Sequence, residues 1–100
     1  MKNIVNKLNK QFESRVRLGI MSVLMVNDSV EFSTLKETLD LTDGNLASHL
    51  ASLEKNKMIE VEKTFRGRKP NTVYRATELG KQAFKEHLSI LETFLNSNKE

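Results

Sequence analysis

The feature that most limits the fold is a pair of alternating segments separated by a short stretch containing glycine and proline. Apolar residues alternate with polar ones from Ile59 to Phe65, which is the period of a half-buried strand. Residues 72–76 have the composition of a second strand. Residues 66–71 separate the two predicted strands and contain Gly67 and the only proline of the chain. We therefore expect a long β-hairpin with residues 66–71 as the loop at its tip.

The predicted hairpin concentrates positive charge. Between residues 63 and 75 there is no acid, and there are five cations: Lys63, Arg66, Arg68, Lys69 and Arg75. The rest of the chain holds the other 11 of its 16 cations beside all 13 acids. A localised basic stripe of this kind indicates a polyanionic partner. The alternative is a solvated surface loop that lacks acids by chance.

Helical periodicity surrounds the hairpin. Helices are predicted near residues 14–26, 33–41, 44–55 and 78–95, with a short strand at 30–32. Each helix follows a side chain typical of an N-cap: Ser14, Ser33, Thr42 and Thr77. Asn56 is expected to adopt the left-handed conformation that ends the third helix.

The order of these elements predicts a fold. Two short helices joined by a tight turn at residues 41–44 form a helix-turn-helix, and the basic hairpin follows directly. The chain is therefore expected to be mainly α with a small β-hairpin, a winged helix-turn-helix in the order α-β-α-α-β-β-α. A length of 100 residues fits one domain spanning residues 1–100.

The third predicted helix carries a small, polar and nearly uncharged face, consisting of Asn45, Ser48, His49 and Ser52. Such a face suits the major groove of DNA, where Asn pairs with adenine and Ser accepts either base type. Thr42 and Gly44 would lie at the helix N-terminus, where backbone N–H groups can hold a phosphate. The face could instead be merely exposed, His49 could pack against the turn, and Thr42 could be only a cap.

The hairpin supplies the second set of candidate DNA contacts. Its members are Lys63, Arg66, Arg68, Lys69, Thr72, Tyr74 and Arg75. The cations at the tip would reach the flanking backbone or the minor groove. Tyr74 is expected at the seam between the core and the DNA.

Two helices also indicate a homodimer. The first helix has a second apolar face formed by Leu18, Met21 and Met25. The last helix carries a stripe formed by Phe84, Leu88, Leu91 and Leu95. We expect the helices near residues 14–26 and 78–95 to form the dimer interface. The alternative is that the first helix is central and wrapped by its own domain.

Several segments resemble those of small bacterial and archaeal winged-helix transcriptional regulators related to the MarR and ArsR groups. The resemblance covers about residues 15–90. It rests on the segments 17–21, 30–36, 41–46, 49–50, 53–54 and 65–70 and on the return strand with Thr72, Tyr74, Arg75 and Thr77. It implies a DNA-binding regulator with the helix of residues 44–55 as its recognition helix and the hairpin as its wing.

The predicted function is a sequence-specific regulator of transcription that binds double-stranded DNA as a homodimer and acts as a repressor. The alternative is a winged-helix module for protein–protein interaction that does not read DNA directly. No phosphate loop, nucleophile elbow or metal-ligand spacing is present, so an enzyme is not expected.

Cofactors and location follow from what the sequence lacks. With no cysteine and two histidines, neither a metal site nor another cofactor is expected. A small-molecule effector is possible, but no residue set identifies one. Because there is no signal-peptide pattern and no apolar run of bilayer length, we expect a cytoplasmic protein without membrane association.

Overall fold

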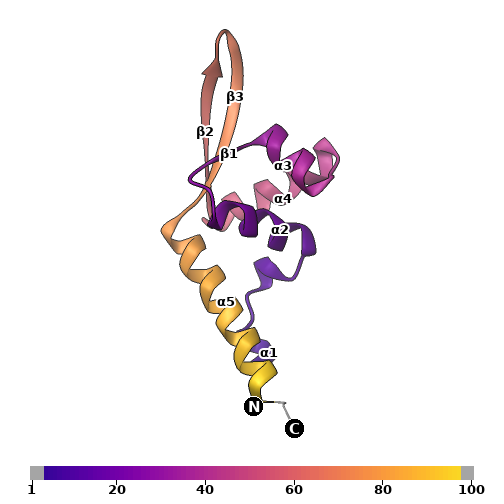
Figure 1. Cartoon of the computed structure of the whole chain (residues 1–100), viewed down its shortest axis with the longest axis vertical. Helices are drawn as coiled ribbons and strands as arrows, with labels where there is room; N and C mark the ends of the chain where they lie inside the picture. The colour runs from indigo at the N-terminus through magenta and orange to yellow at the C-terminus, as the bar shows by residue number, and fades with distance from the viewer. Residues whose placement is uncertain (1–3, 98–100) are drawn as a thin grey trace.

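A computed structural model describes residues 4–97, and its elements follow the expected order with two additions at the start (Figure 1). The helices are α1 (Ile4–Lys7), a 3-10 turn η1 (Lys10–Phe12), α2 (Arg15–Met25), α3 (Phe32–Leu39), α4 (Asp43–Lys55) and α5 (Glu78–Ser97). The strands are β1 (Val30–Glu31), β2 (Ile59–Arg66) and β3 (Lys69–Ala76). The predicted winged helix-turn-helix is confirmed.

The three strands form one antiparallel sheet in the order β1-β3-β2. The hairpin is longer than predicted, because Arg66 pairs with Lys69 and only Gly67 and Arg68 remain in the turn. The expected six-residue loop at 66–71 is therefore wrong. Gly67 has a φ of +67°, whereas Arg68 keeps a negative φ. This is the pattern of a type II′ turn, which lets the two strands continue pairing to the tip.

Side-chain caps fix three of the helix starts. Ser14 accepts hydrogen bonds from the backbone N–H groups of Val16 and Arg17, Thr42 caps α4, and Thr77 caps α5. Each of these predicted caps is confirmed.

Two details of the helix ends differ from the prediction. Ser33 is not the cap of α3, because the helix begins at Phe32 directly after β1, with Glu31 in the N-cap position and no side-chain cap. The left-handed residue after α4 is Lys57, with a φ of +62°, rather than Asn56. The Lys57 backbone N–H bonds to the Glu54 carbonyl, which places the turn one residue later than expected.

Helix α2 is the centre of the core, and α3, α4, the sheet and α5 all contact it. The fully buried side chains include Ile20, Met21 and Leu24 of α2. Leu18 and Met25 are half-buried and pack against the same core. The expected second apolar face of this helix is therefore used by the chain itself, as in the alternative of a wrapped central helix. Met21, at 0% exposed, cannot reach a partner.

The start of α5 belongs to the core, whereas its end leaves the body. Phe84 is buried and packs edge-to-face on Phe12, with ring centroids 5.3 Å apart. The prediction that Phe84 belongs to the dimer interface is therefore wrong, because its side chain is buried within its own chain. The molecule extends 58 × 25 × 21 Å, with the hairpin at one end and α5 with α1 beside it at the other (Figure 1). Within residues 4–97, no helix combines the length and hydropathy needed to cross a membrane.

The segment between α1 and α2 is held to α5 by a buried histidine. His87 Nδ1 accepts a hydrogen bond from the Asn9 backbone N–H at 3.2 Å, and its ring packs on Phe12. Burial lowers the pKa of His87, which favours the neutral ring that this bond requires. The N-terminal segment is thereby fixed along both α5 and the core.

Candidate nucleic-acid interface

The solvent side of α4 carries very small side chains along its middle, between the exposed Asp43 and Asn45 at its start and the exposed Glu54 and Lys55 at its end. Leu46, Leu50 and Leu53 point into the core. The exposed positions on the other side include Gly44, Ala47, Ser48 and Ala51. A helix surface this shallow can approach base edges closely, and alanine methyl groups suit contact with the methyl group of thymine. Sequence reasoning missed both alanines: Ala47 was interpreted as flanking the apolar stripe, and Ala51 has no polar group that would mark it as a candidate contact.

The N-terminal end of α4 carries further predicted contacts. Asn45 is exposed, and its backbone N–H bonds to Thr42 Oγ1 at 3.2 Å. Thr42 is thus a cap, and its exposed position leaves it at the surface beside Gly44. Arg15 lines a hollow together with Asn45, which places a cation of α2 beside this end of α4. Arg15 was not a candidate from sequence, because it lies one residue after the Ser14 cap and outside the basic stretch.

His49 lies at the edge of the exposed face rather than on it. Its Nδ1 is 3.2 Å from an Arg17 guanidinium nitrogen. Since arginine can only donate, Nδ1 accepts, and the proton of the neutral ring is on Nε2. Burial lowers the pKa of His49, and the positive charge of Arg17 lowers it further. His49 therefore keeps one donor, Nε2–H, for an outside acceptor such as a phosphate.

Ser52 is turned toward the N-terminal segment. It is half-buried, and its hydroxyl donates to Gln11 Oε1 at 3.2 Å. The backbone carbonyl of Gln11 accepts a separate hydrogen bond from Arg17 Nε. Ser52 is thus a link between α4 and η1 instead of a free member of the groove face. The sequence signal for this link is weak, because Gln11 and Ser52 are 41 residues apart.

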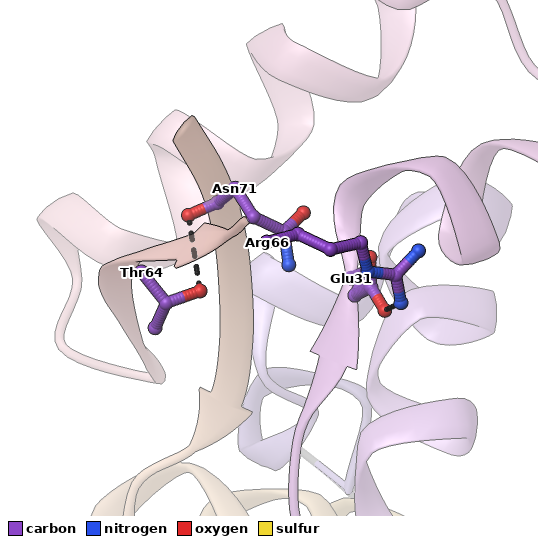
Figure 2. Close-up of polar contacts among 4 residues, drawn as sticks. All are labelled: Glu31, Thr64, Arg66 and Asn71. Atoms are coloured by element: carbon purple, nitrogen blue, oxygen red, sulfur yellow. Dashed lines mark hydrogen bonds and ion pairs between the residues drawn. The ribbon is translucent and has the colours of Figure 1, made fainter. Parts of the chain in front are cut away.

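The hairpin is tied to the rest of the sheet on one of its faces (Figure 2). Arg66 reaches across to Glu31 of β1 and forms an ion pair. Thr64 donates to the Asn71 carbonyl at 3.4 Å on the neighbouring strand. Nearer the base, Arg75 pairs with Glu62 at 2.7 Å. Two of the five cations of the basic stretch are therefore balanced by acids that the fold brings to them.

Three cations of the hairpin have no ion pair within the described chain: Lys63, Arg68 and Lys69, which are all exposed. Thr72 and Tyr74 are half-buried lower on the hairpin. Tyr74 packs near Phe32 with ring centroids 6.4 Å apart. Burial raises the pKa of Tyr74, and the nearby charge of Glu54 raises it further. Tyr74 therefore lies between the core and the surface, and its contact with DNA stays a prediction.

Phe65 differs from the expectation of a half-buried strand residue, because 74% of its surface is exposed. The strand extends beyond the helices that cover its base, so the inward position of the alternation has no core to face at this height (Figure 1). The wing tip therefore combines three unpaired cations with one large exposed aromatic ring.

Comparisons with known proteins agree with this geometry. A family model described as a winged helix DNA-binding domain matches residues 16–95. An uncharacterized protein of Methanocaldococcus jannaschii is 39% identical over 79 residues, covering 79% of this chain and 86% of that protein. The structure of a transcriptional regulator homologue from Pyrococcus horikoshii superposes with a TM-score of 0.89 at 33% identity and full coverage of both chains. The YusO protein of Bacillus subtilis has a TM-score of 0.80 at 17% identity, covering 95% of this chain and 67% of that one.

Proposed function

The chain belongs to the winged helix DNA-binding domain family, and we propose that it is a sequence-specific regulator of transcription acting on double-stranded DNA. In this proposal α4 enters the major groove and the hairpin contacts the flanking backbone or minor groove. Repression is the proposed outcome, because a protein that occupies a promoter needs no activation surface. The cytoplasm is the proposed place of action.

The observation that carries the proposal is the small-residue face of α4 beside a hairpin with unpaired cations. Gly44, Ser48 and Ala51 leave the helix backbone close to any surface laid against it. The exposed Asn45 at the start of this face could make the bidentate contact with adenine. Discrimination between sequences is assigned to these uncharged positions.

The hairpin is assigned the sequence-independent share of the binding free energy. Lys63, Arg68 and Lys69 need not break an ion pair within the described chain before meeting a phosphate. Arg66 and Arg75, by contrast, are paired with Glu31 and Glu62. To bind a phosphate, each arginine would have to break its ion pair or bring the carboxylate close to the phosphate. Arg68, in the two-residue turn, is therefore the cation expected to contribute most.

Asn45→Ala and Arg68→Ala should separate the two roles. Asn45→Ala should weaken binding to the preferred site by about 1–3 kcal/mol and have little effect on random DNA. Arg68→Ala should weaken binding to all sequences and lower the salt slope of log K by about one unit. Titrations of specific and random duplexes across salt concentrations measure both effects.

Lys85→Ala is the matched control, since it removes one cation from the exposed side of α5. Its salt slope should equal that of the parent. The assignment of roles is wrong if Asn45→Ala leaves both affinity and specificity unchanged while Arg68→Ala abolishes both.

We further propose a homodimer held by the projecting end of α5. Leu88, Leu91 and Leu95 recur at helical spacing and are 46%, 38% and 72% exposed. The neighbouring apolar flank already meets α1, around a hollow of about 220 Å³ lined by Val5, Leu8, Ile90, Leu91 and Phe94. Leu91 borders both this hollow and the leucine row, and such a row on the exposed side of a helix is the pattern of a helix–helix interface between subunits. A dimer would present two recognition helices to two half-sites.

Leu91→Lys should weaken the dimer by roughly 2 kcal/mol or more, because it places a charge at the centre of a buried interface. Sedimentation equilibrium at micromolar concentration should give twice 11.5 kDa for the parent and a lower mass for the variant. Ser89→Lys adds the same charge at an exposed α5 position outside the leucine row and should remain dimeric. A parent that sediments as a monomer contradicts the proposal.

A further inference from the structure

We propose that Phe65 and Pro70 at the wing tip form an apolar wedge that enters the minor groove of DNA. Nothing in the expected roles of the basic residues assigns a task to these two side chains. The inference rests on the proposed function and adds a way in which the wing would discriminate between DNA sequences. Phe65 and Pro70 are directly opposite each other on β2 and β3, and both are exposed.

The two faces of the hairpin differ in chemistry. Because strand side chains alternate, one face carries Val61, Lys63 and Phe65 on β2, opposite Tyr74, Thr72 and Pro70 on β3. This face has no acid and includes one unpaired cation, Lys63. We call it the apolar wing face.

The opposite face is polar and largely neutralised. It carries Glu60, Glu62 and Arg66 on β2 and Lys69 and Arg75 on β3. The Arg66–Glu31 pair (Figure 2) and the Arg75–Glu62 pair lie there, so Lys69 is its one cation outside these pairs. A phosphate approaching this face would meet carboxylates that already hold the arginines. Charge complementarity therefore favours the apolar wing face and the tip as the side that meets DNA.

The wing tip is as short a turn as two paired strands commonly allow. The turn contains only Gly67 and Arg68, so the hairpin ends in its narrowest form. Phenylalanine and proline are among the side chains that proteins insert between base steps from the minor groove. Lys63 on the same face and Arg68 in the turn would meet the phosphates on either side. The occupant is thus identified as double-stranded DNA rather than an apolar protein surface.

A wedge of this kind discriminates between DNA sequences by how easily each base step can be deformed. Unstacking a base step requires least free energy at flexible pyrimidine–purine steps such as TA. Duplexes with a TA step where the wing lands should therefore bind more tightly than those with a G·C-rich step at the same place. The preferred TA step would lie beside the base pairs that α4 contacts.

Phe65→Trp provides a direct test, because the chain contains no tryptophan and the substitution places a single tryptophan at the tip, whose emission can be excited separately from that of Tyr74. Adding duplex DNA should quench the emission by stacking on bases, more strongly for duplexes with TA steps than for G·C-rich ones. Val26→Trp, on an 81% exposed position after α2, is the control and should keep its emission. Equal quenching in both variants, or none in Phe65→Trp while DNA is bound, overturns the wedge.

Phe65→Ala supplies a second readout. It should weaken duplex binding about tenfold with the salt slope unchanged, because no charge is lost, and thus differ from Arg68→Ala. If Phe65→Ala binds DNA like the parent but loses self-association in sedimentation, the ring serves a protein contact and the wedge is wrong. If the parent binds no duplex even at low salt, the proposed function itself fails, which separates the two failures.

Discussion

Gly80→Ala should lower the free energy of unfolding by about 3 kcal/mol, at the upper end of the usual effect of overpacking. A Cβ at this position of α5 would lie 1.9 Å from the Met58 carbonyl oxygen. That oxygen cannot easily move away, since the Thr77 backbone N–H donates to it at 3.0 Å, while the Thr77 hydroxyl donates to the adjacent Lys57 carbonyl at 2.6 Å. The start of α5 would have to separate from the turn between α4 and β2.

Thermal or denaturant unfolding at fixed protein concentration measures this effect. A loss of about 3 kcal/mol in a domain of 100 residues corresponds to a decrease in Tm of roughly 12–24 °C. Gly44→Ala is the matched control, because its added Cβ meets nothing within 4 Å and its φ is not positive. Alanine inside a helix is normally stabilising, so this control should be neutral or slightly more stable. Equal effects from both variants would contradict the close contact at Gly80.

The local features of the fold could be predicted from sequence. The caps at Ser14, Thr42 and Thr77 depend on side chains two or three residues from the bonds they make. The hairpin follows from strand alternation and from Gly67, which supplies the positive φ of the turn. The helix-turn-helix order needs only the periodicity of each helix and the length of each connection.

The distribution of charge could not be predicted in the same way. Glu31 and Arg66 are 35 residues apart, and β1 brings them together only by joining the far side of β3. A count of charges along the hairpin therefore overstated its free positive charge. The same limit applies to Ser52, whose partner Gln11 lies in a segment with no clear periodicity.

The assignment of apolar residues to core or interface also required the structure. Met21 and Leu91 both lie on apolar helix faces, yet Met21 is fully buried by its own chain and Leu91 is 38% exposed. The difference arises because α2 is surrounded by other elements, whereas the end of α5 extends past the core with α1 beside it. Periodicity identifies an apolar face but not the element that covers it.

Ala51→Glu should nearly abolish DNA binding while leaving the fold intact. Ala51 is exposed in the middle of the small-residue face of α4, so a longer side chain costs little stability. Against DNA, the same carboxylate would hold the helix away from the groove and repel the phosphates. Like charges brought together at an interface cost several kcal/mol, so we expect binding at least 100-fold weaker.

Ser89→Glu is the matched control for the change in charge. Both substitutions add one negative charge at an exposed helix position and reduce the formal net charge of +3 by one. Ser89 belongs to α5, which leads from the base of the hairpin to the opposite end of the molecule (Figure 1). A purely electrostatic effect of net charge would weaken both variants alike, whereas a groove contact weakens only Ala51→Glu.

The most direct test is a fluorescence anisotropy titration of one labelled duplex with the parent chain, Ala51→Glu and Ser89→Glu at the same salt concentration. The account predicts saturable binding by the parent and by Ser89→Glu, with the Kd of Ala51→Glu raised at least 100-fold. Equal binding by all three proteins, or none by the parent, would contradict the claim that DNA is read by the small-residue face of α4.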